Sequence, residues 1–293
     1  MGTFFIENWF IGWILLELNT ITFLGILAPT TYKSFFKEAP LNYFIAQRIS
    51  SIFLVFSLYI LLFLKSFFFT NIIFVRALFF KIAIFPFQGW LILIVPRISW
   101  LFFFIIITFQ KIIPFIFIEL RKLEINNLLI ASILGTIFFG RLRNRLANNL
   151  KSLILFSRIS NTRWLIIRTL IRTKIWKLFF IIYFIFLGFI FLQELKNTTY
   201  SKITFFSLIG VAGLPPLAGF FPKILIIIYL ININIKIFLI LLLLSSVLDF
   251  YFYTRLSYKA LISLKTNLKL KKNSRPRINQ FFILLACCFP LIF

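Results

Sequence analysis

The sequence has 293 residues, of which 61% are hydrophobic and only 13% charged, and its mean hydropathy is +1.03. A soluble domain carries about a quarter of its residues as Asp, Glu, Lys or Arg, so this composition excludes an ordinary soluble protein. The formal net charge of +25 does not indicate a nucleic-acid partner, because many Lys and Arg lie inside or beside apolar runs and form no single exposed basic face.

Apolar runs long enough to cross a bilayer follow one another along most of the chain. They are too continuous for the alternating strands of a membrane barrel. We therefore predict an all-α polytopic membrane protein with about ten transmembrane helices of roughly 20 residues each, in one domain over residues 1–293. The predicted spans are 8–28, 42–66, 72–94, 98–119, 126–142, 150–170, 176–195, 203–230, 234–258 and 278–293.

Proline lies in the middle of three spans, at Pro86, at Pro114 and at the pair Pro215-Pro216. Proline removes a helix hydrogen bond and clashes with the preceding turn. Inside a bilayer such a break is tolerated where it is buried in protein or lines a hydrated cavity. The proline pair also stands between two glycines, with Lys223 shortly after it. We predict discontinuous helices near Pro114 and near Pro215-Pro216.

Four ionisable side chains inside the spans are candidate functional residues, because a charge in the membrane is costly unless it has a partner or water. They are Glu17, Lys81, Lys111 and Lys223. A buried carboxylate needs a cation, so we predict an ion pair between Glu17 and Lys81. Lys111 and Lys223 lie beside predicted breaks, where ionisable groups mark ion pathways in transporters. The alternative is that these lysines extend along their apolar stems to the membrane surface.

Three further features carry weaker signals. Asp249 is a buried acid that we expect to pair with Arg255 or to lie at a helix end. The basic stretch 265–277 is either a solvated loop held on one side of the membrane or an amphipathic surface helix. The adjacent Cys287 and Cys288 indicate core packing, because neighbouring cysteines seldom satisfy disulfide geometry.

Six segments spread over most of the chain carry a family resemblance: 17–19, 42–47, 81–90, 109–114, 213–223 and 251–256. The most specific is the string Gly-Leu-Pro-Pro-Leu-Ala-Gly-Phe at 213–220, followed by Pro222 and Lys223. In order and spacing these segments resemble the chain 2 family of the proton-pumping NADH–ubiquinone oxidoreductase (complex I) of mitochondria, in its invertebrate form.

The resemblance implies an antiporter-like subunit in which Glu17, Lys81, Lys111 and Lys223 translocate protons. It implies that NADH, FMN, iron–sulfur clusters and ubiquinone are bound by partner subunits, so that this chain holds no cofactor or metal and performs no redox chemistry. The implied partners are neighbouring antiporter-like membrane-arm subunits and membrane lipids. The implied location is the inner mitochondrial membrane, with the chain encoded in the organelle, and the lack of a basic leader fits that expectation. The alternatives are a free-standing cation/proton antiporter and a purely structural membrane-arm subunit.

Two departures from the family pattern stand out. Gln88 occupies a position where the family usually has His. Because Gln forms hydrogen bonds but cannot titrate, a proton relay here must use lysines and water. Only sixteen residues precede Glu17, so we expect that a family helix upstream of it is missing, and that another subunit or lipid replaces it.

The arginines fit their positions poorly. The chain has 14 Arg and 18 Lys but only seven Asp and Glu, and several Arg lie within apolar spans. An Arg at mid-membrane costs about 3 kcal/mol on insertion scales. Invertebrate mitochondria read the codons AGA and AGG as Ser, and Ser is readily accommodated in transmembrane helices. We predict that many of these arginines are serines in the protein; the alternative is that they face partner acids or lipid headgroups. The positions concerned are Arg48, Arg76, Arg158, Arg163, Arg168 and Arg172.

Overall fold

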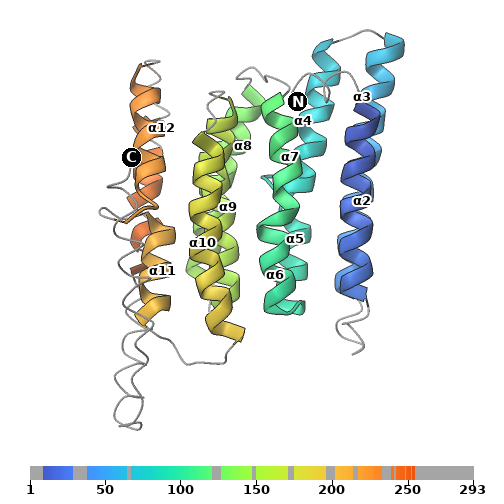
Figure 1. Cartoon of the computed structure of the whole chain (residues 1–293). Coiled ribbons are helices and arrows are strands. Elements are labelled where there is room, and N and C mark those ends of the chain that lie inside the picture. The colour runs from blue at the N-terminus through green and yellow to red at the C-terminus, as the bar shows by residue number, and fades with distance from the viewer. Residues whose placement is uncertain are drawn as a thin grey trace. The chain divides into compact units, whose positions relative to one another are not determined.

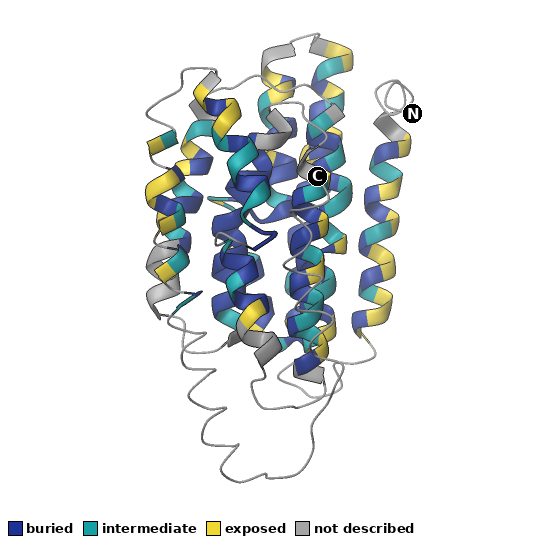
Figure 2. Cartoon of the chain, turned by 60° about the vertical axis from the view of Figure 1, so that its left-hand side comes forward, coloured by how far each residue is buried: buried dark blue, intermediate teal, exposed yellow. Residues whose placement is uncertain are grey.

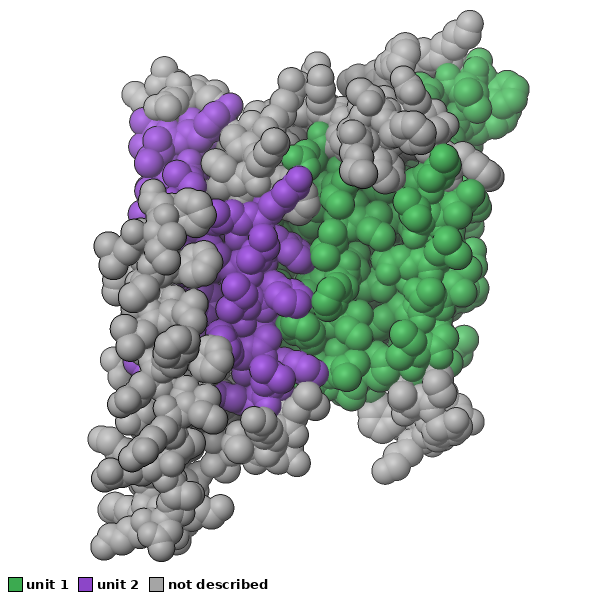
Figure 3. All heavy atoms as spheres, viewed as in Figure 1, with its two compact units in different colours: residues 1–172 green, residues 173–293 purple. Residues whose placement is uncertain are grey.

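A computed structural model describes most of the chain up to residue 254. The described residues are 9–28, 38–64, 67–120, 127–146, 150–170, 175–195, 202–213, 217–232, 239–240, 242–247, 249–251 and 253–254. The chain forms two compact units, Met1–Arg172 and Thr173–Phe293 (Figure 3). Each regular element within the described ranges is a helix, so the all-α prediction is confirmed. A single domain over residues 1–293 stays a prediction.

The first unit is a bundle of helices (Figure 1). Helix α3 packs against α2, α4 and α5, whereas α7 packs against α2, α4, α6 and α9, and α8 packs against α9. The chain order is α2 (Trp9–Leu27), α3 (Glu38–Tyr59) continued by the π-helical turn η3 (Ile60–Leu64), α4 (Phe67–Ile82), α5 (Gly89–Ile94), the 3-10 turn η4 (Val95–Arg97), α6 (Trp100–Ile107), α7 (Phe109–Leu120), α8 (Asn127–Leu146) and α9 (Leu150–Leu170).

The second unit contains α10 (Ile175–Leu195), α11 (Lys202–Ala212) and α12 (Phe221–Asn232), and α10 packs against both of the others. The predicted span 234–258 is described only in part. The span 278–293, the basic stretch 265–277 and the two cysteines lie outside the described residues. Each predicted span from 8–28 to 203–230 coincides with one helix or with two consecutive helices.

Polar and apolar side chains are distributed as in a membrane protein. On α3, Ser50 and Ser57 are buried, and each hydroxyl donates a 2.6 Å hydrogen bond to the carbonyl three residues earlier. On the same helix Ile52 is 66% exposed, and Phe56 is also exposed. Figure 2 shows buried and exposed positions alternating along the helices. A continuous apolar surface of this kind requires lipid or a partner to cover it. By length and composition, the stretches Glu38–Phe63 and Trp100–Glu119 suffice to cross a membrane.

The predicted helix interruptions are present, and one lies upstream of its expected position. Helix α6 ends at Ile107, Thr108 is a turn residue, and Pro114 lies inside α7. A proline ring clashes with the carbonyl four residues earlier, which here belongs to Gln110, so the interruption at Thr108 lies two residues further upstream than this clash. Thr108 stabilises that turn by donating a 2.6 Å hydrogen bond from its hydroxyl to the carbonyl of Phe104. The break therefore precedes Lys111.

Two further interruptions divide other predicted spans. Between α4 and α5 the chain turns at Ala83, whose φ is +63°. Between α11 and α12 it turns at Gly213, whose φ is +72°. That backbone conformation ends helices because it directs the chain out of the helical path, and glycine adopts it at little cost. The predicted break near Pro215-Pro216 is confirmed, because α11 ends at Ala212 and α12 begins at Phe221, although the two prolines themselves lie outside the described residues.

Candidate functional site

The predicted ion pair between Glu17 and Lys81 is confirmed by the structure. Glu17 lies on α2 and Lys81 on the last turn of α4, and both residues are buried. The Nζ of Lys81 is 3.8 Å from Oε1 of Glu17. Neither residue has a nearer counter-charge in its own helix, so the packing of α2, α3 and α4 brings the two charges together. The pair is therefore a tertiary feature of the first unit.

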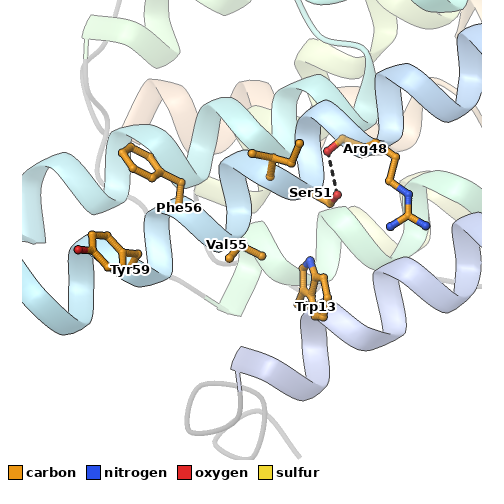
Figure 4. Close-up of a pocket in the computed structure, with 7 residues that line it drawn as sticks. Trp13, Arg48, Ser51, Val55, Phe56 and Tyr59 are labelled. Atoms are coloured by element: carbon orange, nitrogen blue, oxygen red, sulfur yellow. Dashed lines mark hydrogen bonds between the residues drawn. The ribbon is translucent and has the colours of Figure 1, made fainter.

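The same carboxylate has a second cationic partner that the sequence analysis missed. Nη1 of Arg48, on α3, is 2.9 Å from Oε2 of Glu17. The Arg48 side chain is 42% exposed, and it lines an open groove of about 470 Å³ with Trp13 of α2 and residues of α3 (Figure 4). The feature of the sequence that could have indicated this contact is the scarcity of acids, because the few buried carboxylates attract each cation that lies nearby. This contact agrees with the alternative that Arg48 is an arginine facing an acid.

Lys81 stands immediately before the interruption between α4 and α5. Its side chain is 2% exposed, and the chain leaves the helical path two residues later at Ala83. The indole Nε1 of Trp90, on α5, donates a 3.0 Å hydrogen bond back to the carbonyl of Phe80, which ties the two helices together. Gln88 is buried at the start of α5. The break therefore surrounds Lys81 with protein.

Lys111 occupies the first turn of α7, just after the interruption at Thr108. Its residue exposure is 5%, and its backbone N–H donates a 3.1 Å hydrogen bond to the carbonyl of Thr108. Arg158 is also buried, on α9, which packs against α7. Lys111 is thus enclosed by helices and does not extend to the protein surface.

Lys223 is held by the carbonyl end of a helix in the second unit. It lies in the first turn of α12 and its residue exposure is 3%. Its ammonium donates a 2.6 Å hydrogen bond to the carbonyl of Ala212, the last residue of α11. The neighbouring carbonyl of Val211 accepts a 2.9 Å hydrogen bond from the hydroxyl of Tyr183. Because the last carbonyls of a helix lack helical partners and carry partial negative charge, they stabilise a cation there.

Glycines allow the close backbone approach that this arrangement needs. A Cβ placed on Gly219 would lie 2.0 Å from the carbonyl oxygen of Gly210 on α11. A Cβ on Gly213 would lie 2.8 Å from the Nζ of Lys223. Only residues without a side chain fit at both positions, which explains why glycines flank the proline pair.

The remaining candidates are placed less completely. Asp249 is buried in the second unit, but Arg255 lies outside the described residues, so their pairing stays a prediction. Arg76 is exposed on α4, whereas Arg158 and Arg163 are buried on α9. Among the described residues, no group of three or more His, Cys, Asp or Glu side chains lies close enough to hold a metal ion.

The family model and similar proteins indicate the same protein family. The family model described as NADH:quinone oxidoreductase/Mrp antiporter, TM, matches residues 7–249. NADH-ubiquinone oxidoreductase chain 2 of Anopheles gambiae is 27% identical, with 94% of this chain and 85% of the relative covered. The protein of the same name from Artemia franciscana is 28% identical, with 93% and 90% covered.

Two solved structures share the fold. A chain of respiratory complex I from Thermus thermophilus with bound aureothin has a TM-score of 0.74 and 17% identity over 84% of this chain and 64% of its own length. A chain of the Mrp complex from a Dietzia species has a TM-score of 0.72 and 16% identity over 83% of this chain and 55% of its own length. This chain thus spans about two thirds of the first structure and about half of the second. It belongs to the membrane-spanning family of NADH:quinone oxidoreductase and Mrp antiporter subunits.

Proposed function

We propose that this chain is a proton-translocating membrane-arm subunit of a mitochondrial NADH:ubiquinone oxidoreductase. The observation that carries the proposal is the placement of its buried lysines: Lys81, Lys111 and Lys223 each lie within three residues of a helix interruption. Interrupted helices expose backbone groups that bind ions and water inside a membrane. An ionisable side chain beside such a break can take up and release a proton away from lipid.

The Glu17–Lys81 ion pair supplies the element that changes state in this proposal. When Lys81 gains or loses a proton, its attraction to Glu17 changes, and so does the field at the next lysine. Transport requires a coupling free energy between such sites, which buried charges in a medium of low dielectric constant can supply. In this proposal the chain contributes proton transfer to the enzyme, and the names of its relatives support its membership of an oxidoreductase.

The redox chemistry belongs to other subunits in this proposal. NADH, FMN, iron–sulfur clusters and ubiquinone would be bound by partners, and the neighbours in the membrane would be further antiporter-like subunits and lipids. The location in this proposal is the inner mitochondrial membrane, with the chain encoded in the organelle. The relatives' names support a subunit of NADH-ubiquinone oxidoreductase.

The test uses the assembled enzyme in sealed vesicles, with Lys111→Ala as the variant. We expect NADH-driven electron transfer to lose its coupling to proton uptake through this chain, because removing a positioned proton carrier typically slows transfer by about 100-fold or more. Lys177→Ala, at an exposed position on α10, is the matched control. Normal pumping by an assembled Lys111→Ala enzyme would leave only a structural role. Purification of the chain without oxidoreductase subunits would favour a free-standing antiporter.

A further inference from the structure

A hydrogen-bonded cluster of neutral side chains joins three helices beside the charged residues. The Nδ2 of Asn19, on α2, donates a 3.0 Å hydrogen bond to Oε1 of Gln110, on α7, and the Nε2 of Gln110 donates back to Oδ1 of Asn19 at 3.3 Å. The hydroxyl of Tyr43, on α3, donates a 3.1 Å hydrogen bond to the same Oε1. We call Asn19, Tyr43 and Gln110 the amide bridge.

The amide bridge lies between the ion pair and the central lysine. Asn19 is two residues from Glu17, and Gln110 immediately precedes Lys111. Tyr43 is fully buried. The amide bridge therefore connects the helix segment that carries Glu17 with the helix segment that carries Lys111.

A second contact between α2 and α7 shows how the two helices that the amide bridge joins are aligned with each other. A Cβ placed on Gly12 of α2 would lie 2.3 Å from the ring of Phe117 on α7, so the two helices approach closely there. Gly12 precedes Asn19 by seven residues, and Phe117 follows Gln110 by seven. Seven residues are about two helical turns. The two helices therefore run antiparallel, with one apolar and one polar contact two turns apart.

We propose that the amide bridge positions Lys111 at the level of Glu17 and transmits the state of the Glu17–Lys81 pair to Lys111. This inference rests on the proposed function. Gln110 follows the interruption at Thr108, after which the backbone N–H of Lys111 donates its hydrogen bond only three residues back, to the carbonyl of Thr108. A side-chain bond to Asn19 at that point fixes α7 against α2, and the Tyr43 hydroxyl ties both to α3. Asn19, Tyr43 and Gln110 are positioning residues, because they carry no titratable group at neutral pH.

The experiment measures protons taken up per NADH oxidised by the assembled enzyme in sealed vesicles. Gln110→Ala removes all three side-chain contacts, and Tyr43→Phe removes one hydroxyl while keeping the ring packed on Phe23, 4.9 Å away between ring centroids. We expect each net hydrogen bond lost to slow proton transfer involving Lys111 about fivefold, and so to lower the ratio of protons taken up to NADH oxidised. Asn71→Ala, which removes an exposed amide on α4, is the control that keeps the normal ratio.

An exchange of the two amides distinguishes positioning from bulk packing. Asn19→Gln and Gln110→Asn each alter the span of the bridge and lower the ratio, whereas the double exchange restores the span and the ratio. Native gels report the amount of assembled enzyme, which a merely structural role would lower without changing the ratio. A normal ratio in assembled Gln110→Ala enzyme overturns the inference if Lys111→Ala lowers the ratio. A normal ratio in Lys111→Ala itself overturns the proposed function instead.

Discussion

The Glu17–Lys81 pair allows a quantitative test of what holds the first unit together. Glu17→Gln keeps the size of the side chain and removes its charge, which leaves the cations of Lys81 and Arg48 without their counter-charge. At the observed 3.8 Å and an effective dielectric constant of about 20, the attraction between Lys81 and Glu17 is about 4 kcal/mol. Arg48 adds less, because its side chain is 42% exposed and solvent screens it.

The destabilisation by Glu17→Gln alone is therefore expected at about 3–5 kcal/mol, the usual cost of leaving a buried charge uncompensated. Lys81→Met should cost less than this, because Arg48 still neutralises Glu17. The double variant should recover most of the loss, because replacing a buried ion pair with neutral groups is often close to neutral. The assay measures the unfolding of this chain within the purified enzyme in detergent. A coupling energy below about 0.5 kcal/mol in the double-mutant cycle would refute the reasoning.

Two other predictions follow from close packing and from the buried cations. Gly219→Ala places a methyl group against the carbonyl of Gly210 and should lower the amount of assembled enzyme several-fold. Gly188→Ala, in open space on α10, should instead stabilise its helix by about 0.5–1 kcal/mol. Native gels and thermal unfolding compare the two variants, and equal effects would contradict the geometry. Tandem mass spectrometry of the chain should show serine in place of Arg158 and Arg163, and a peptide containing either arginine would contradict that expectation.

The sequence was sufficient to predict the helices and one of their tertiary contacts. Long apolar runs determine where helices cross the membrane, so the predicted spans match the observed helices closely. The Glu17–Lys81 contact was predictable because acids are so scarce that few pairings exist. Burial of Lys111 and Lys223 followed from the nearby breaks, although the proline rule placed one break at Pro114 and not at Thr108.

The remaining features depend on helix rotation and register, which the composition of a span does not reveal. Arg48 was identified as misplaced, but its position on the face of α3 toward Glu17 came only from the packing. Pro86 marked the span in which the chain turns, but no glycine marked Ala83 as the residue that leaves the helical path. The contact between Asn19 and Gln110 joins neutral residues 91 positions apart, and neutral amides have many possible partners.

The hydrogen bond between Lys223 and the carbonyl of Ala212 has a consequence for how this part of the protein tolerates mutation. Each amino acid supplies a backbone carbonyl, so a substitution at Ala212 changes the side chain and keeps the acceptor. The Glu17–Lys81 contact is different, because a single substitution at either end removes it. Substitutions at Ala212 therefore leave the hydrogen-bond acceptor of Lys223 in place. Only changes in chain length or in the glycines of the turn can remove that acceptor.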